Sequence, residues 1–516
     1  MDLMIKTAYR LTKLSRRGRL SRGCGTCRKR KIRCDETQPS CRHCIKAGWA
    51  CPRYDDVKER LFQNRTLADF QDNPFRGAGG SEIPAAQYKD SGSTQRGGRR
   101  HAMSLSPPPH IVQAVSDRAI DLFLSSHVLR DKASIRGYFE YLPDFSLSHR
   151  QDSSFSASLN AAALAAYGNT VQSTEILIQA RAYLGAAIRC VNKALMSPDD
   201  AIKDTTVISI MLLATFETIT CRDQKSLKDC DMHTKGATAI IEMRGLQQFQ
   251  SVLGMQLFVQ MCGEISRGCL QRSVHVPSGV IAARSHAAAL FGEPDTAWKL
   301  GDLIIQVAEF RATVKDRILC TPAAIIATAL ELDALLYILA TFVPIEYRFE
   351  IMQPHHNLEL VRGGYYHVYP SFSAAHFWND LRTCRILLHQ EICRQAELLH
   401  MPDQDQLLQS KGLIHQHGLD ICATVPQYSG YLTLLVPQNL MAKPPQNLLP
   451  GTSVHAHAVY SLLWPLLIAG QSTDSDDKRP WIVLRARDIG RSTGIHQAFA
   501  LADVLAKREK IHIWEG

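Results

Sequence analysis

Six cysteines near the start of the chain follow a strict spacing, C-x2-C-x6-C-x6-C-x2-C-x6-C. They are Cys24, Cys27, Cys34, Cys41, Cys44 and Cys51. The unit C-x2-C-x6-C occurs twice in succession, so the segment is an internal duplication. A segment of about 30 residues cannot build a sufficient hydrophobic core, and units of this size fold around metal ions or disulfides. The cysteines therefore decide what this part of the chain can become.

Zinc explains these cysteines better than disulfides do. Thiolates bind Zn²⁺ tetrahedrally, and a C-x2-C turn brings two sulfurs to one ion. Two ions need eight ligand positions, so two of the six sulfurs must bridge if both ions bind; Cys24 and Cys41, which open the two halves, are the natural bridges. His43 lies inside the second C-x2-C turn, and we expect it to be an exposed turn residue rather than a ligand.

The cysteines outside this cluster favour a reducing compartment. Nine of the 15 cysteines are scattered without pattern through apolar segments. Lys6 and Arg10 interrupt any apolar stretch at the N-terminus, so we expect no secretory signal and no disulfide framework.

Positive charge is concentrated at the cysteine-rich end. Residues 1–53 hold 15 Lys and Arg against 3 Asp and Glu, whereas the remainder holds 44 against 46. This segregation is typical of a nucleic-acid-binding head on a near-neutral body. Residues 1–22 read as a basic arm for phosphate attraction or nuclear import, although their Arg-rich, acid-poor composition also fits a mitochondrial transit peptide.

The two halves of the duplication differ in charge. Five basic residues stand between Cys27 and Cys34, whereas residues 45–50 contain one. Guanine presents two acceptors in the major groove, and Arg and Lys, which only donate, read it best. The first half is therefore predicted to face DNA. The basic run taken alone is equally typical of a nuclear localisation signal.

The rest of the chain predicts a linker and a large helical body. Residues 55–70 suggest a short helix, and 16 of the 36 residues from Pro74 to Pro109 are Gly, Pro or Ser, which indicates a disordered linker. Beyond residue 110 the apolar residues recur three and four apart. Helices are expected near residues 112–123, 177–195, 201–219, 230–243, 251–269, 296–317, 322–341, 372–398, 405–417, 453–469, 481–489 and 493–508, with a cap at Ser197-Pro198.

The cysteine segment, from Gly23 to Tyr54, resembles the fungal zinc binuclear cluster (Zn(II)2Cys6) family of transcription regulators and keeps every ligand spacing. The resemblance implies two Zn²⁺ ions and a helix after the second cysteine that enters the major groove at a CGG triplet. It assigns base reading to Lys31 with Arg30. It assigns phosphate contacts to Arg28, Lys29 and Arg33. Pro39 and Trp49 match the family's loop proline and a frequent aromatic before the sixth cysteine.

The body resembles the helical fungal-specific transcription factor domain that accompanies these clusters. His233-Thr234-Lys235-Gly236-Ala237 with Arg244-Gly245 looks like that domain's H-x-x-G-A … R-G segment, and Leu463–Gly470 looks like its W/F-P-L … A-G segment. Residues 275–295 and 343–372 fit no pattern. The fold expected is mostly α: a Zn2Cys6 module (23–54) follows the basic arm (1–22), and residues 55–109 join it to an irregular all-α regulatory domain (110–516).

Other motifs give no further chemistry. The chain lacks G-x-S-x-G, G-x4-G-K-[ST], H-E-x-x-H and G-x-G-x-x-G, so no enzyme is predicted. We interpret His455-x-His457 and His355-His356 as ordinary surface or core residues, Asp474–Asp477 as a solvated turn, and His233 and Arg244 as braces for helix ends. The longest apolar run, Ala458–Ala469, is too short for a membrane span and contains Pro465, so no membrane partner is expected.

Together these features predict a nuclear, sequence-specific DNA-binding regulator of RNA polymerase II transcription that reads CGG-like triplets through two zinc ions. Its expected partner is double-stranded DNA, with a second copy of itself and transcriptional co-regulators as further candidates. The alternative is a body that senses a ligand or a protein, in which DNA binding serves only as the anchor.

Overall fold

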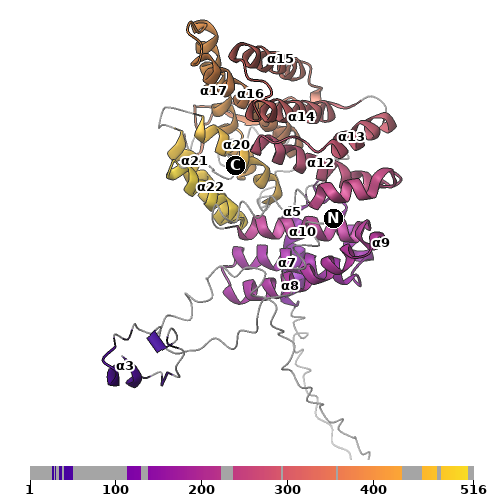
Figure 1. Cartoon of the computed structure of the whole chain (residues 1–516), viewed down its shortest axis with the longest axis vertical. Coiled ribbons are helices and arrows are strands. Elements are labelled where there is room, and N and C mark those ends of the chain that lie inside the picture. The colour runs from indigo at the N-terminus through magenta and orange to yellow at the C-terminus, as the bar shows by residue number, and fades with distance from the viewer. Residues whose placement is uncertain are drawn as a thin grey trace, which may run out of the picture. The chain divides into compact units, whose positions relative to one another are not determined.

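The structure is a computed structural model, and it places part of the chain well enough to describe. The described residues are 26–27, 30, 34–35, 37, 40–49, 51, 113–128, 138–221, 236–291, 294–355, 358–432, 456–472 and 478–508. The chain forms two compact units, Met1–Pro108 and Pro109–Gly516 (Figure 1). The expected short helix at 55–70 and the expected linker lie outside the described residues.

The N-terminal unit is organised by its cysteines. Helix α3, Arg42–Lys46, begins directly after Cys41, whose sulfur accepts the N–H of Cys44 at 3.4 Å. The helix ends at Lys46, and Gly48 two residues later has a φ of +64°, a left-handed conformation that glycine adopts without a Cβ clash. Cys27, Cys41 and Cys44 are completely buried, so the interior formed by the described residues of this unit consists of sulfur rather than of large apolar side chains.

The body begins with a group of helices around one alanine-rich helix, α7. These are α5 (Val115–His127), α6 (Leu142–Ser148), α7 (Ser153–Thr170), α8 (Thr174–Leu195), α9 (Pro198–Ala201) and α10 (Asp204–Thr220). The Asp152 carboxylate caps α7 by accepting the N–H groups of Ser154 and Phe155, both at 3.0 Å. The small residues of Ala161–Ala166 are buried on all sides, because α5, α8 and α10 pack closely around them.

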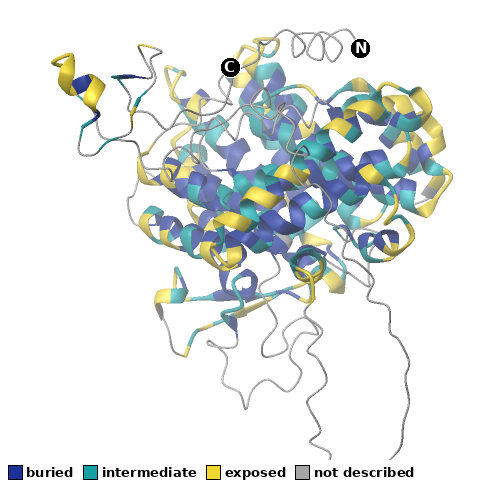
Figure 2. Cartoon of the chain, turned by 90° about the horizontal axis from the view of Figure 1, so that it is seen from below, coloured by how far each residue is buried: buried dark blue, intermediate teal, exposed yellow. Residues whose placement is uncertain are grey.

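The remaining helices continue the same core. They are α12 (Val252–Arg272), α13 (Ser278–Phe291), α14 (Thr296–Lys315), α15 (Pro322–Thr341), α16 (Phe372–Ala396), α17 (Gln404–Cys422), α18 (Val425–Tyr428), α20 (Ala456–Gln471), α21 (Arg479–Thr493) and α22 (Gln497–Ala506). Helix α16 is buried along most of its length against α14, α15, α17 and α20. Figure 2 shows the buried residues running through the middle of the helical body.

Most of the expected helices are confirmed where the structure describes them. Helix α15 has the expected limits. Helix α16 ends two residues before its expected end, and α17 ends five residues after its own expected end. The predicted cap is also present, since the Ser197 hydroxyl accepts the N–H of Asp200 at 3.4 Å. Arg244 is buried and forms an ion pair with Asp204 in the first turn of α10, which is the predicted bracing role; His233 lies outside the described residues.

Two segments that fitted no sequence pattern have regular structure. Residues 275–295 contain α13, in which Arg284, Ser285 and His286 stand together between two apolar runs, so the sequence lacks a clear helical periodicity. Residues 343–372 contain an antiparallel pair, β1 (Glu350–Met352) and β2 (Tyr366–Val368), in which Ile351 lies opposite His367. Strands of three residues are too short to establish an alternating pattern. The described part of the body is therefore mostly α and contains one small sheet, which the prediction of an all-α domain omitted.

Helix α15 is long and apolar enough to cross a membrane, judged by length and composition alone. The expectation that no segment has this property is therefore wrong for α15. Glu331 and Asp333 interrupt the apolar sequence of this helix, so it contains no uninterrupted apolar run long enough to span a membrane. One such helix is weak support for a membrane span, and Asp333 forms a buried ion pair with Arg385 of α16.

Candidate metal centre and nucleic-acid interface

Three cysteine sulfurs meet in the interior of the N-terminal unit. The Sγ atoms of Cys27, Cys41 and Cys44 all lie within 4.8 Å of one another. Those of Cys27 and Cys41 are 3.6 Å apart. Two thiolates on one tetrahedral Zn²⁺, each about 2.3 Å from the ion, stand roughly 3.8 Å apart. The residues present therefore fit a zinc ion, and a C-x2-C turn from one half meets a cysteine of the other half there.

Cys41 also belongs to a second group of possible ligands. Its sulfur lies within 4.8 Å of a ligand atom of Cys34 and of Asp35, and its backbone N–H donates to the sulfur of Cys51 at 3.5 Å. A sulfur that belongs to two ligand groups is what a bridging thiolate requires. The geometry thus fits the role predicted for Cys41, while Cys24, the other predicted bridge, lies outside the described residues.

Asp35 is a residue that the sequence reasoning missed. Its Oδ2 accepts the Thr37 hydroxyl at 2.7 Å and the N–H of Arg42 at 3.2 Å, which ties the loop after Cys34 to the start of α3. The hydrogen bond from Thr37 is the main cause that lowers the pKa of Asp35. The signal in the sequence is a D-x-T turn directly after the third cysteine. His43 is exposed on α3, as predicted, and belongs to neither group of possible ligands.

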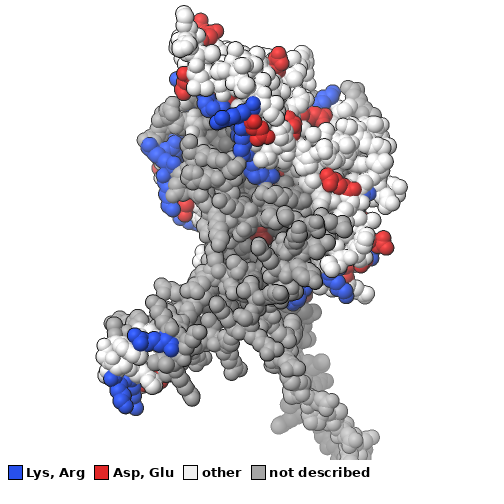
Figure 3. All heavy atoms as spheres, in the orientation of Figure 1, with Lys and Arg blue, Asp and Glu red and all other residues white. Residues whose placement is uncertain are grey.

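The described basic residues of this unit lie on its surface. Arg30, Arg42 and Lys46 are exposed, and Figure 3 shows Lys and Arg side chains on this unit. Arg42 and Lys46 both belong to α3, and Arg42 adds one positive charge to the one that residues 45–50 contain. The other predicted DNA contacts, Arg28, Lys29, Lys31 and Arg33, lie outside the described residues.

A cation–π contact joins the two halves. The guanidinium carbon of Arg30 lies 3.9 Å from the ring centroid of Trp49. The N–H of Arg30 also donates to the carbonyl of Thr26 at 3.1 Å, as in a helical turn, and the N–H of Trp49 donates to the carbonyl of Cys44 at 2.9 Å. A guanidinium over an indole face is attracted by the ring quadrupole. Trp49 of the second half therefore restrains a predicted base-reading residue of the first.

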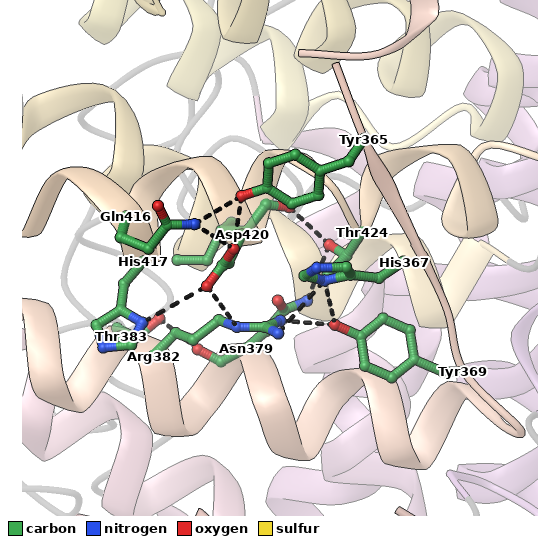
Figure 4. Close-up of polar contacts among 11 residues, drawn as sticks. Tyr365, His367, Tyr369, Asn379, Arg382, Thr383, Gln416, His417, Asp420 and Thr424 are labelled. Atoms are coloured by element: carbon green, nitrogen blue, oxygen red, sulfur yellow. Dashed lines mark hydrogen bonds and ion pairs between the residues drawn. The ribbon is translucent and has the colours of Figure 1, made fainter. Parts of the chain in front are cut away.

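The body contains a polar cluster that sequence reasoning also missed. It consists of Tyr365, His367, Tyr369, Arg382, Gln416, His417 and Asp420 (Figure 4). The Arg382 guanidinium donates to the Tyr369 hydroxyl at 2.6 Å, and the Tyr365 hydroxyl donates to Asp420 at 2.7 Å. The signal in the sequence is the aromatic-rich run of residues 365–369, Tyr-Tyr-His-Val-Tyr.

Most of these polar groups are paired with one another, but neither ring nitrogen of the largely buried His417 makes a hydrogen bond; its Nδ1 lies 3.8 Å from the Asp420 carboxylate. Burial, followed by the charge of Arg382, lowers the pKa of His367 to about 3, so this ring is neutral at pH 7. Burial alone would raise the pKa of Asp420, but hydrogen bonds and the Arg382 charge outweigh it and hold that pKa well below its usual value. The cluster fastens the strand pair onto α16 and α17.

A second buried ion pair fastens α15. The Asp333 carboxylate accepts two hydrogen bonds from Arg385, at 2.6 and 2.9 Å, and His389 Nε2 lies 3.3 Å from it. The other nitrogen of His389 contacts the Ser410 hydroxyl of α17 at 3.0 Å. Burial opposes ionisation of Asp333, but its bonds to Arg385 and His389 outweigh burial and lower its pKa.

Comparison with known proteins gives two family matches. Residues 22–61 match the model of the fungal Zn(2)-Cys(6) binuclear cluster domain, and residues 145–265 match that of the fungal specific transcription factor domain. The second match includes the His233–Gly245 segment and excludes Leu463–Gly470.

A curated relative, an uncharacterized transcriptional regulatory protein of Schizosaccharomyces pombe, is 50% identical over 44 residues. Those residues are 8% of this chain and 8% of the relative, so the similarity covers a small part of either protein. No solved structure matches the chain.

Proposed function

We propose that this chain, which carries a fungal zinc binuclear cluster domain and a fungal specific transcription factor domain, is a nuclear, sequence-specific DNA-binding regulator of RNA polymerase II transcription. Both domains are those of transcription factors rather than enzymes, and a binuclear cluster domain binds two zinc ions. The observation that carries the proposal is the meeting of the Cys27, Cys41 and Cys44 sulfurs inside the segment that the cluster model matches.

The metal site in this proposal uses all six cysteines. Cys24, Cys27, Cys34, Cys41, Cys44 and Cys51 would hold the two zinc ions, with Cys24 and Cys41 as the predicted shared ligands. The ions would supply the folding energy of residues 23–54, because the described part of this unit buries sulfur rather than a large apolar core. Residues 110–516 form the regulatory domain, connected through 55–109, and the arm 1–22 adds phosphate contacts.

Base reading in this proposal falls to Lys31 with Arg30, at a CGG-like triplet, while Arg28, Lys29 and Arg33 neutralise phosphates. The stacking of Arg30 on Trp49 supports this division, since a side chain held before binding loses less conformational freedom when it contacts a base. Phosphate contacts release counterions, so binding should weaken steeply as salt rises.

Replacing Lys31 with Ala tests sequence reading. We expect the affinity of the zinc-loaded chain for a CGG-containing duplex to fall by about 1–3 kcal/mol, the usual value of a good base contact, with little change for a scrambled duplex. Arg28→Ala is the matched control: as a phosphate contact it should weaken both duplexes alike and reduce the salt slope by about 1. Fluorescence anisotropy titrations at several salt concentrations measure both effects. Equal binding of both duplexes by the wild type, with Lys31→Ala unchanged, would refute the specific-reader model.

Replacing Trp49 with Ala tests the restraint on Arg30. An exposed cation–π contact contributes about 0.5–1 kcal/mol, so we expect a two- to fivefold loss of affinity for the specific duplex at constant zinc content and constant salt slope. Trp49→Phe keeps an aromatic face and should lose less. The same titrations, with zinc measured by mass spectrometry, check this. A Trp49→Ala chain that keeps its zinc and full specific affinity would show that the stacking has no role in reading.

A further inference from the structure

A group of charged side chains lies between α12 and α16. Glu264 and Arg267 are three residues apart on α12, and the Arg267 guanidinium donates to Glu264 Oε1 at 2.9 Å. Another nitrogen of Arg267 lies 3.5 Å from Oδ2 of Asp380 on α16. His376, one turn before Asp380, places its Nε2 3.3 Å from the same oxygen. These four side chains, which we call the Arg267 cluster, connect two helices that are distant in the sequence.

The Arg267 cluster is accessible and yet poorly hydrated. The side chains of Arg267 and His376 are 25% and 29% exposed. Burial is nevertheless the largest influence on both groups. It lowers the pKa of His376, and it opposes the charge of Arg267, whose pKa is raised because Glu264 and Asp380 outweigh burial. Side chains on an open surface are not desolvated in this way. The exposed surface of these two groups therefore faces a recess within the helical body.

Aromatic side chains adjoin the Arg267 cluster. They are partly buried, and they comprise Tyr138 and Tyr141, which precede α6, and Tyr460 and Trp464, one turn apart on α20. Burial, and next the charge of Glu264, raises the pKa of Tyr138. Tyr460 lies close enough to Arg267 to raise the pKa of that guanidinium. The Tyr141 hydroxyl donates at 3.3 Å to Oε1 of Gln260, one turn before Glu264. Flat apolar faces thus stand beside the charged groups.

The Arg267 cluster has an excess of negative charge. Glu264 and Asp380 are negative at pH 7 and Arg267 is positive, whereas the lowered pKa of His376 keeps its ring neutral. Since His376 Nε2 faces a carboxylate, the ring proton lies there and Nδ1 is left as an acceptor. This buried Nδ1 has no hydrogen-bond partner among the described residues. Uncompensated charge and an unpaired acceptor away from bulk water are unfavourable unless a ligand or a water molecule supplies the partner.

We propose that this recess binds a small molecule that combines an aromatic ring with a protonated amino group. The ammonium group would offset the excess negative charge and donate to the carboxylates of Glu264 and Asp380. The ring would pack among Tyr138, Tyr460 and Trp464, whose faces also attract a cation. A ligand that carries a carboxylate would instead add to the excess negative charge. The proposal concerns the helical body and does not depend on DNA binding.

Titration of the full zinc-loaded chain with phenethylamine tests the proposal. We expect isothermal titration calorimetry to give an affinity about tenfold higher for phenethylamine than for 3-phenylpropionate, which has the same ring and a carboxylate in place of the ammonium group. Glu264→Gln should weaken phenethylamine binding about tenfold, because it removes a charge that pairs with the ammonium group. The matched control is Glu391→Gln, which breaks a similar pair with Arg394 three turns further along α16 and should leave the affinity unchanged. Far-UV circular dichroism checks that both variants fold.

Replacing Tyr460 tests the aromatic part of the site. Tyr460→Leu removes one ring face and should weaken phenethylamine binding about threefold, whereas Tyr460→Phe keeps that face and should change it little. In the wild type, no binding of phenethylamine at about 1 mM overturns the proposal, as does equal or tighter binding of 3-phenylpropionate. These two results need no variant, so they hold even if a substitution prevents folding. Undiminished binding by a folded Glu264→Gln chain would also overturn the proposal, because the ligand would then lie elsewhere.

Discussion

Replacing Cys41 with Ser is expected to remove both zinc ions and, with them, specific DNA binding. The Cys41 sulfur belongs to both ligand groups, so its loss takes a ligand from each ion. A neutral hydroxyl replaces a thiolate poorly, and structural zinc supplies about 10–16 kcal/mol of folding free energy in small zinc domains. We expect zinc content to fall from two ions per chain to well below one, and affinity for the specific duplex to fall to the non-specific level.

Cys44→Ser separates a bridging from a terminal ligand. Cys44 belongs to one of the two groups, so its replacement should weaken one ion and leave about one zinc per chain. Cys320→Ser, an exposed cysteine far from the cluster in sequence, should keep two. Inductively coupled plasma mass spectrometry and anisotropy titrations measure these outcomes. Two retained zinc ions in Cys41→Ser would contradict a bridging role.

Asp333→Asn is expected to destabilise the helical body by about 3–5 kcal/mol, the usual cost of removing one partner from a buried ion pair. The amide cannot accept both hydrogen bonds from Arg385, whose guanidinium is left buried and uncompensated. The matched control is Asp503→Asn, which breaks an exposed pair with Arg487 and should cost about 0–1 kcal/mol. Urea unfolding followed by circular dichroism gives both values.

The effect of Asp333→Asn should depend on pH in a defined direction. The pKa of Asp333 is lower in the folded chain than in the unfolded chain, so its contribution is fully present above the unfolded value, near 4, and is lost as the pH falls through the folded value. The stability gap between wild type and variant should therefore be constant near neutral pH and shrink below about pH 4. A gap that persists in acid would mean that packing, not the charge of Asp333, is responsible.

Features that depend on residues close together in the sequence could be predicted from the sequence. The spacing of the cysteines predicts a zinc site because ligand distance along a short chain limits which sulfurs can meet one ion. The limits of α15 were predicted from the sequence, and those of α16 were predicted to within two residues. The concentration of basic residues in residues 1–53 is visible from the composition of the sequence alone. Each of these signals lies within a few turns of the chain.

Contacts between distant segments were decided by the tertiary structure. The contact of Arg30 with Trp49 joins two half-repeats, and Asp333 and Arg385 are 52 residues apart. The pairing of β1 with β2 joins strands that are too short to be predicted from an alternating sequence pattern. An apolar helix such as α15 does not encode which of its faces will be covered. Packing against α14 and α16 selected the face that contains Asp333, because a buried carboxylate needs its guanidinium partner, and left the face of Ile338 and Phe342 exposed.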